Sequence, residues 1–78
     1  MADGNELDKA IFVMLASPNT PASIRTYLED ARNEPTDEKA LRLEEAFRKL
    51  PPGTFESYTE VERSQITIGV SEAELLGY

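Results

Sequence analysis

The side chains that most often carry out catalysis are either missing from this chain or lack the partners they need. The sequence contains no Cys and no His. Their absence excludes thiolate nucleophiles, histidine general bases and zinc sites built from Cys and His. A serine nucleophile needs a base beside it, and Ser23, Ser57 and Ser64 have no histidine to serve them. We therefore predict that the protein is not an enzyme.

Carboxylates are abundant, but their spacing is not that of a catalytic or metal-binding pair. Glu29-Asp30 and Glu44-Glu45 are adjacent in the sequence, and adjacent residues of a helix point in different directions. A calcium-binding loop needs Asp and Asn at alternate positions, then a Gly and a later Glu. The chain has neither this pattern nor a Gly-rich phosphate-binding loop. We expect no cofactor and no metal ion.

The size of the chain and the distribution of its apolar residues indicate a small cytoplasmic protein. With 78 residues, the chain is long enough for one small domain. Its longest apolar run, residues 10–16, is far shorter than the roughly 20 residues that cross a bilayer. The first six residues include two acids and no base, whereas a signal peptide begins with a basic region. We expect a soluble protein without a membrane partner.

Three segments in residues 5–50 show the apolar spacing of amphipathic helices. Prolines and turn residues separate them at 17–19, 33–35 and 51–53. Thr20 and Thr36 each precede a segment, where threonine is a favoured helix N-cap. These segments predict a three-helix core, with a first helix that is buried on several sides. The expected core side chains are Ile11, Met14, Leu15, Ile24, Leu28, Leu43, Phe47 and Leu50.

The last quarter of the chain has a different pattern. In residues 65–70, three β-branched residues alternate with Gln, Thr and Gly, which is typical of a β-strand. Short helical turns are expected before and after it. We predict a mostly α fold: a single domain that is a small bundle of three to five short helices, with one short C-terminal extended segment or strand. A lone strand either lies across its own helices or pairs with another chain, and the sequence leaves both open.

The net charge of −7 is unevenly distributed. Residues 20–50 contain six basic and seven acidic side chains, and residues 51–78 contain five Glu and only Arg63, which gives −4 for that segment. An acidic surface repels phosphate backbones and attracts basic protein surfaces. The preferred partner is therefore another protein, with a basic one favoured by charge, or a second copy of the chain. Nucleic acid is disfavoured.

These observations predict a small acidic, non-enzymatic protein that acts through protein–protein contact, as a regulator, an inhibitor or an assembly component. The acidic C-terminal segment, residues 51–78, is the expected interaction element, because apolar residues are unusually frequent at its end. The candidate contact residues are Ile66, Ile68, Val70, Leu75, Leu76 and Tyr78.

Residues 22–47 resemble a known family of DNA-binding domains. The similarity lies in Ile24-Arg25-Thr26-Tyr27-Leu28, in Arg32-Asn33-Glu34-Pro35-Thr36 and in residues 40–46, Ala-Leu-Arg-Leu-Glu-Glu-Ala. This stretch resembles the later half of the lambda-repressor-like helix-turn-helix domains. In that family a recognition helix ends in an aromatic-Leu pair, and a short loop and a packing helix follow it.

The resemblance implies a second function, a helix-turn-helix transcriptional regulator that binds DNA. Carried over by position, Ile24 and Leu28 are core residues of the recognition helix. The side chains implied to face the major groove or to approach phosphate are Ser23, Arg25, Thr26 and Arg32. Because Glu29 and Asp30 place two carboxylates beside that surface, DNA binding is the alternative and protein contact the main prediction.

Overall fold

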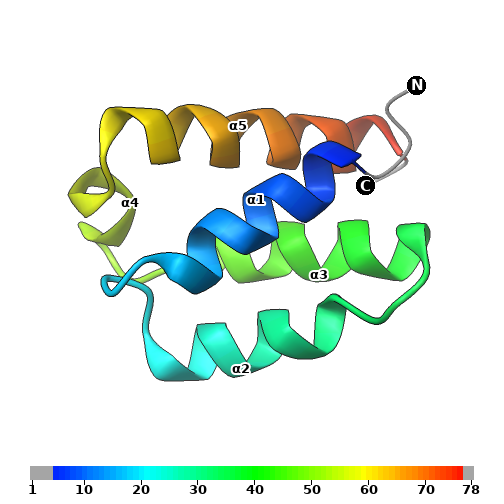
Figure 1. Cartoon of the computed structure of the whole chain (residues 1–78), viewed down its shortest axis with the longest axis horizontal. Helices are drawn as coiled ribbons and strands as arrows, with labels where there is room; N and C mark the ends of the chain where they lie inside the picture. Colours follow the sequence, from blue (N-terminus) through cyan, green and yellow to red (C-terminus); the bar gives the residue numbers. More distant parts are fainter. Residues whose placement is uncertain (1–4, 77–78) are drawn as a thin grey trace.

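The computed structural model describes residues 5–76 and consists of five helices over that range (Figure 1). They are α1 (Asn5–Ala16), α2 (Ala22–Ala31), α3 (Thr36–Arg48), α4 (Thr54–Ser57) and α5 (Glu60–Leu75). This part of the chain contains no strand. The mostly helical fold is therefore confirmed, and the bundle measures 29 × 23 × 19 Å along its principal axes.

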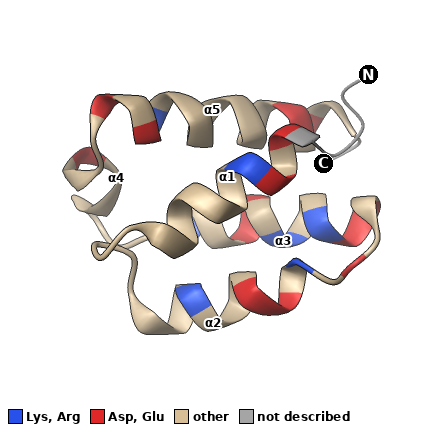
Figure 2. Ribbon diagram, viewed as in Figure 1, with Lys and Arg blue, Asp and Glu red and all other residues tan. Residues whose placement is uncertain are grey.

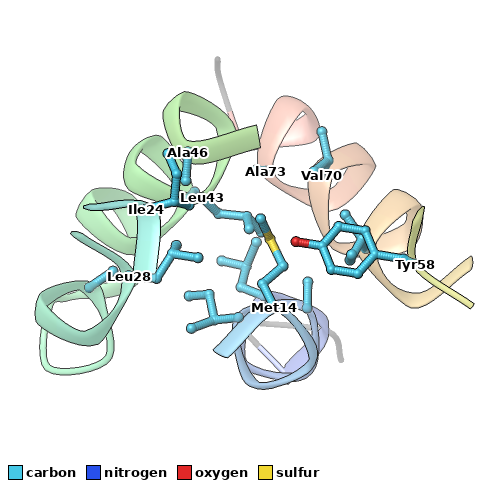
Figure 3. Close-up of a cluster of buried hydrophobic side chains, with 14 residues drawn as sticks. Met14, Ile24, Leu28, Leu43, Ala46, Tyr58, Val70 and Ala73 are labelled. Atoms are coloured by element: carbon cyan, nitrogen blue, oxygen red, sulfur yellow. The ribbon is translucent and has the colours of Figure 1, made fainter. Parts of the chain in front are cut away.

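Helix α1 holds the bundle together. It crosses between α5 on one side and α2 and α3 on the other (Figure 1), and it packs most extensively on α5. Helix α3 also contacts both α2 and α5. The core side chains therefore come from all four longer helices and from Tyr58, which precedes α5 (Figure 3). They are Leu7, Ala10, Ile11, Met14, Ile24, Leu28, Ala31, Ala40, Leu43, Ala46, Tyr58, Ile66, Val70 and Ala73.

The predicted core is largely correct. Ile11, Met14, Ile24, Leu28 and Leu43 are buried, as their helical spacing requires. The other three predicted residues, Leu15, Phe47 and Leu50, are partly buried and pack against the core. The first helix is less enclosed than expected, because Phe12 is exposed.

The C-terminal strand prediction is wrong, because residues 60–75 form a helix. A capping box begins it: the backbone N–H of Glu62 donates to the Thr59 hydroxyl, and the Glu62 carboxylate accepts from the Thr59 N–H. From there Ile66, Gly69, Val70 and Ala73 recur at helical spacing, and all four are buried. This longer helical pattern prevails over the six-residue alternation that predicted a strand.

A buried hydrogen-bond chain joins the start of α5 to the turn after α1. The Thr20 hydroxyl donates to the Met14 carbonyl oxygen at 2.6 Å, and the Tyr58 hydroxyl lies 2.6 Å from the same Thr20 oxygen. A threonine hydroxyl has one hydrogen, and the carbonyl takes it, so Tyr58 donates to Thr20. Figure 3 shows the Tyr58 hydroxyl directed into the core.

Arg25 closes the C-terminal end of α1. Its guanidinium donates to the carbonyl oxygens of Leu15 at 2.9 Å, Ser17 at 2.9 Å and Thr20 at 3.2 Å. Carbonyls at a helix end have no partner within the helix, and a cation there also interacts favourably with the helix dipole. Arg25 therefore fixes the turn between α1 and α2.

Candidate protein-interaction surface

The outer side of α5 carries a line of exposed apolar side chains. Val61, Ile68 and Leu75 are 78%, 49% and 82% exposed, and steps of seven residues place them on one side of the helix. Two exposed serines, Ser64 and Ser71, lie between them on that side. We call these five residues the α5 stripe. The stripe lies opposite the face that α5 buries in the core.

A shallow depression borders the stripe near the N-terminal end of α5. Its volume is about 430 Å³. It is lined by Phe55, Glu60, Arg63, Ser64, Thr67 and Ile68. The ring of Phe55 packs edge-on against Phe47 at 5.4 Å and against Tyr58 at 6.4 Å between centroids, so its position is fixed from two sides. We call this feature the Phe55 depression.

Apart from Arg63, the charged side chains of α5 are acidic, and they lie towards the two ends of the helix (Figure 2). Glu60 precedes the stripe, and Glu72 and Glu74 flank its far end, whereas residues 64–71 contain no charged side chain. The one nearby cation, Arg63, donates to the backbone carbonyl oxygens of Tyr58 at 2.6 Å and Glu56 at 3.3 Å. The middle of the stripe is thus uncharged, and both ends are negative.

The structure divides the predicted protein-contact residues into two groups. Ile68, Leu75 and Leu76 are exposed and remain candidates. Ile66 and Val70 are core side chains, because the helical turn directs them away from Ile68 instead of alongside it. Tyr78 lies outside the described residues. Val61 was missing from the prediction, although its seven-residue step to Ile68 is visible in the sequence.

Three of the four predicted DNA-contact residues are exposed, and the fourth, Arg25, is held by the fold. Ser23 and Thr26 are exposed on the outer side of α2, and Arg32 is exposed beyond its end. Arg25 is half-buried and holds the end of α1. The sequence could not reveal this, because the carbonyls that Arg25 binds come together only when α1 ends in its turn.

A second hollow, of about 340 Å³, lies elsewhere on the surface. Its lining is Asp8, Ile11, Phe12, Arg32 and Lys39. Lys39 Nζ lies 2.6 Å from Asp8 Oδ1, so much of its charge is compensated within the protein. The lining therefore keeps a single positive charge, that of Arg32, and we do not assign the site to this hollow.

A polar cluster between α2 and α3 has a structural role. The Tyr27 hydroxyl donates to the Glu45 carboxylate, and Arg42 and Lys49 lie 5.0 Å and 5.6 Å from the centre of the Tyr27 ring. The hydrogen bond to Glu45, burial and the negative charge of Glu45 raise the pKa of Tyr27, against a lowering effect of Arg42. These contacts hold α2 on α3.

The comparisons give no relatives from which a site could be transferred. No protein-family model matches the chain, and no curated protein or solved structure is significantly similar to it. Residues 5–76 contain no helix that is both long and apolar enough to cross a membrane. Within the same residues, no group of three acidic side chains is arranged to hold a metal ion. The α5 stripe is the feature that most needs an explanation.

Proposed function

We propose that this protein is a cytoplasmic, non-enzymatic regulator or assembly component that acts by docking another polypeptide on the α5 stripe. The exposure of Val61, Ile68 and Leu75 on one side of a single helix carries the proposal. Single exposed apolar residues are common, but here three lie in line along one side of the same helix, over four helical turns. Such surfaces are typical of interaction sites.

The shape of the stripe favours a helix as the docked element. Apolar residues seven apart form the seam along which two helices pack. Ser64 and Ser71 leave room between them for side chains of the docked helix. Glu60, Glu72 and Glu74 limit what can lie beside the seam, because opposing acidic side chains repel. The partner must therefore present basic or uncharged polar residues there.

DNA binding, the function that the helix-turn-helix resemblance implies, receives less support. Arg25 is engaged in three hydrogen bonds at the end of α1, and Glu29 and Asp30 are exposed beside Thr26. A DNA duplex on this surface would therefore face two carboxylates, and the main cation of the surface, Arg25, would not be free to contact its phosphates. Fluorescence anisotropy with genomic duplex fragments at low salt tests this alternative. We expect no binding, and tight, salt-sensitive binding would favour the regulator of transcription instead.

Affinity capture with surface variants tests the proposed function. The full chain is immobilised as wild type, Leu75→Glu or Phe12→Glu and exposed to an extract of the native host, to which free copies of the chain are added. The bound polypeptides are then quantified by mass spectrometry. Phe12 is a matched control, because it is 69% exposed on α1. We expect Leu75→Glu to lose the bound polypeptide and Phe12→Glu to keep it. Equal binding by all three proteins would contradict the proposal.

A further inference from the structure

The α5 stripe is complementary to itself when one copy is reversed. Large side chains and serines alternate along it. In an antiparallel pair of helices, each residue faces one that lies equally far on the other side of the two-fold axis. An axis between Gly69 and Val70 places Ile68 opposite Ser71 of a second copy, and Leu75 opposite Ser64. Each layer within residues 64–75 then pairs a large side chain with a small one, which allows the two helix axes to approach to about 8 Å. Val61 lies beyond these layers.

We propose that the occupant of the α5 stripe is a second copy of this chain, with the two α5 helices antiparallel about that axis. The inference rests on the proposed function, because it names the partner of the same surface. A parallel pair fits less well. It would place Ile68 against Ile68 and Ser64 against Ser64, which leaves gaps at the serine layers, and unfilled space forfeits packing energy.

Charge selects the register of the antiparallel pair. A residue that flanks the seam lies beside the flanking residue on the same side of the other helix, two positions from the one directly opposite. With the axis between Gly69 and Val70, Glu74 therefore lies beside Thr67 of the other copy, and Glu72 lies beside Gln65. Hydroxyl and amide groups can donate to carboxylates. Gln65 uses one amide N–H on Glu6 at 3.0 Å and keeps a second.

Moving the axis to Ile66 preserves the alternation of large and small side chains. By the same rule it also places Glu60 next to Glu74 of the other copy, where the two carboxylates repel. The register centred between Gly69 and Val70 avoids this contact and so is the one that we expect.

The position of the Phe55 depression independently supports the antiparallel dimer. The depression borders Ser64, Thr67 and Ile68, in the N-terminal half of α5. An antiparallel second copy brings the C-terminal end of its own α5 over that half. Leu75 of the second copy then meets Ser64 at the edge of the depression. A pocket that receives an apolar side chain is typical of the positions that contribute most to binding. The two-fold axis repeats this contact.

The dimer that follows is weak and depends on salt. The contact is limited to one side of a four-turn helix, so the buried area is at the low end for protein interfaces. Each chain also carries a net charge of −7, and the two copies repel at long range. Salt screens that repulsion. Added salt therefore strengthens a dimer of this kind, whereas it weakens binding to a basic partner.

Sedimentation equilibrium of the full chain, up to about 1 mM and at low and high salt, tests for the dimer. We expect a monomer–dimer equilibrium that tightens with salt. Leu75→Glu, at an exposed position, should weaken association at least about tenfold, and Phe12→Glu should leave it unchanged. Circular dichroism confirms that each variant is folded. A chain that stays monomeric, or a dimer that weakens with salt, would overturn the inference.

Cysteine cross-linking tests orientation and register, because the chain has no cysteine of its own. Ser64→Cys and Leu75→Cys proteins are oxidised separately and as a mixture. In the proposed dimer, position 64 of one copy lies beside position 75 of the other copy. The two positions 64 lie about 16 Å apart along the helix axis, which is too far for a disulfide. We expect a disulfide-linked dimer only in the mixture. Efficient linkage of either protein alone would show a different arrangement.

The two proposals fail in different ways. A chain that remains monomeric yet captures another polypeptide, lost in Leu75→Glu, would overturn the dimer and keep the proposed function. Self-association that Leu75→Glu leaves intact would also overturn the dimer, because the second copy would then bind elsewhere. The proposed function itself fails only if Leu75→Glu still captures every polypeptide that the wild type captures.

Discussion

Gly69 of α5 lies directly against Ala10 of α1, with no room for a side chain between the two helices. A methyl group added at Gly69 would overlap the Cβ atom of Ala10 and come 3.0 Å from the Glu6 carbonyl oxygen. The most extensive helix contact in the bundle, between α1 and α5, therefore depends on the smallest residue.

Gly69→Ala tests this contact, and we expect it to destabilise the protein. Overpacking costs about 1–3 kcal/mol, whereas replacing a helical glycine by alanine contributes about 1 kcal/mol in favour of folding. The net loss in the free energy of unfolding should reach about 1 kcal/mol, measured by urea denaturation. Thr67→Ala, at an exposed position of the same helix, is the control and should be slightly stabilising, because alanine has the higher helix propensity. Equal stability of the two variants would show that α1 and α5 can move apart.

Leu43→Ala tests the centre of the core. Leu43 is fully buried, and removing such a side chain costs about 2–5 kcal/mol. Leu75→Ala removes the same atoms from an 82% exposed position and should change stability by less than about 0.5 kcal/mol. Urea denaturation of both variants, at concentrations where the chain is monomeric, measures the difference. A small effect at Leu43 would mean that α3 packs differently.

The buried hydrogen-bond chain predicts an order of stabilities. Tyr58→Phe removes only the terminal donor and should cost about 1 kcal/mol. Thr20→Val leaves both the Tyr58 hydroxyl and the Met14 carbonyl oxygen without their partner, and each unpaired buried group costs about 1–3 kcal/mol. Thr20→Val should therefore be the less stable variant in thermal unfolding. The reverse order would show that the Tyr58 hydroxyl has a different acceptor.

The raised pKa of Tyr27 predicts a loss of folding stability at alkaline pH. Its pKa is raised in the folded protein, so the folded state holds the phenolic proton more tightly than the unfolded state does. The resulting stabilisation is present below the unfolded pKa of about 10 and disappears as the pH rises through the higher folded value. Unfolding measured from pH 9 upwards should show this decline in the wild type and a smaller one in Tyr27→Phe. Identical pH profiles would exclude the contribution of Glu45.

Substitution of Arg25 and Arg32 tests whether Arg25 has a structural role. Arg25→Ala leaves three carbonyl oxygens at the end of α1 without their charged donor. Because a hydrogen bond to a charged group contributes about 1.5–3 kcal/mol, we expect a clear loss of stability. Arg32→Ala, at an exposed position, should be neutral in urea denaturation. If Arg25→Ala is equally neutral, its hydrogen bonds are not needed for the fold.

Local signals in the sequence were sufficient for the first three helices but not for α5 or for the contacts between helices. Prolines and apolar spacing placed α1, α2 and α3 within a few residues. Thr20 was expected to cap α2, yet its hydroxyl bonds Met14 and Tyr58. The Tyr58 partner is 38 residues away, and no local pattern reports such a contact.

Residues 65–70 show a second limit of local patterns. β-Branched residues at every other position fit a strand, but Ile66 and Val70 also fit a helix at a spacing of four. Whether the segment folds as a helix or as a strand depends on the Thr59 cap and on the surface of α1 that Gly69 approaches. The candidate site changed accordingly, since only the residues of that segment outside the core can meet a partner.

The pairing of α1 with α5 also has a consequence for how the protein folds. These two helices come from opposite ends of the described chain, so the largest contact closes a loop of more than about 40 residues, and such closure slows folding. During synthesis, the apolar face of α1 stays without its main partner until α5 has left the ribosome. Until then, the growing chain leaves exposed the apolar residues of α1 that α5 covers in the finished bundle.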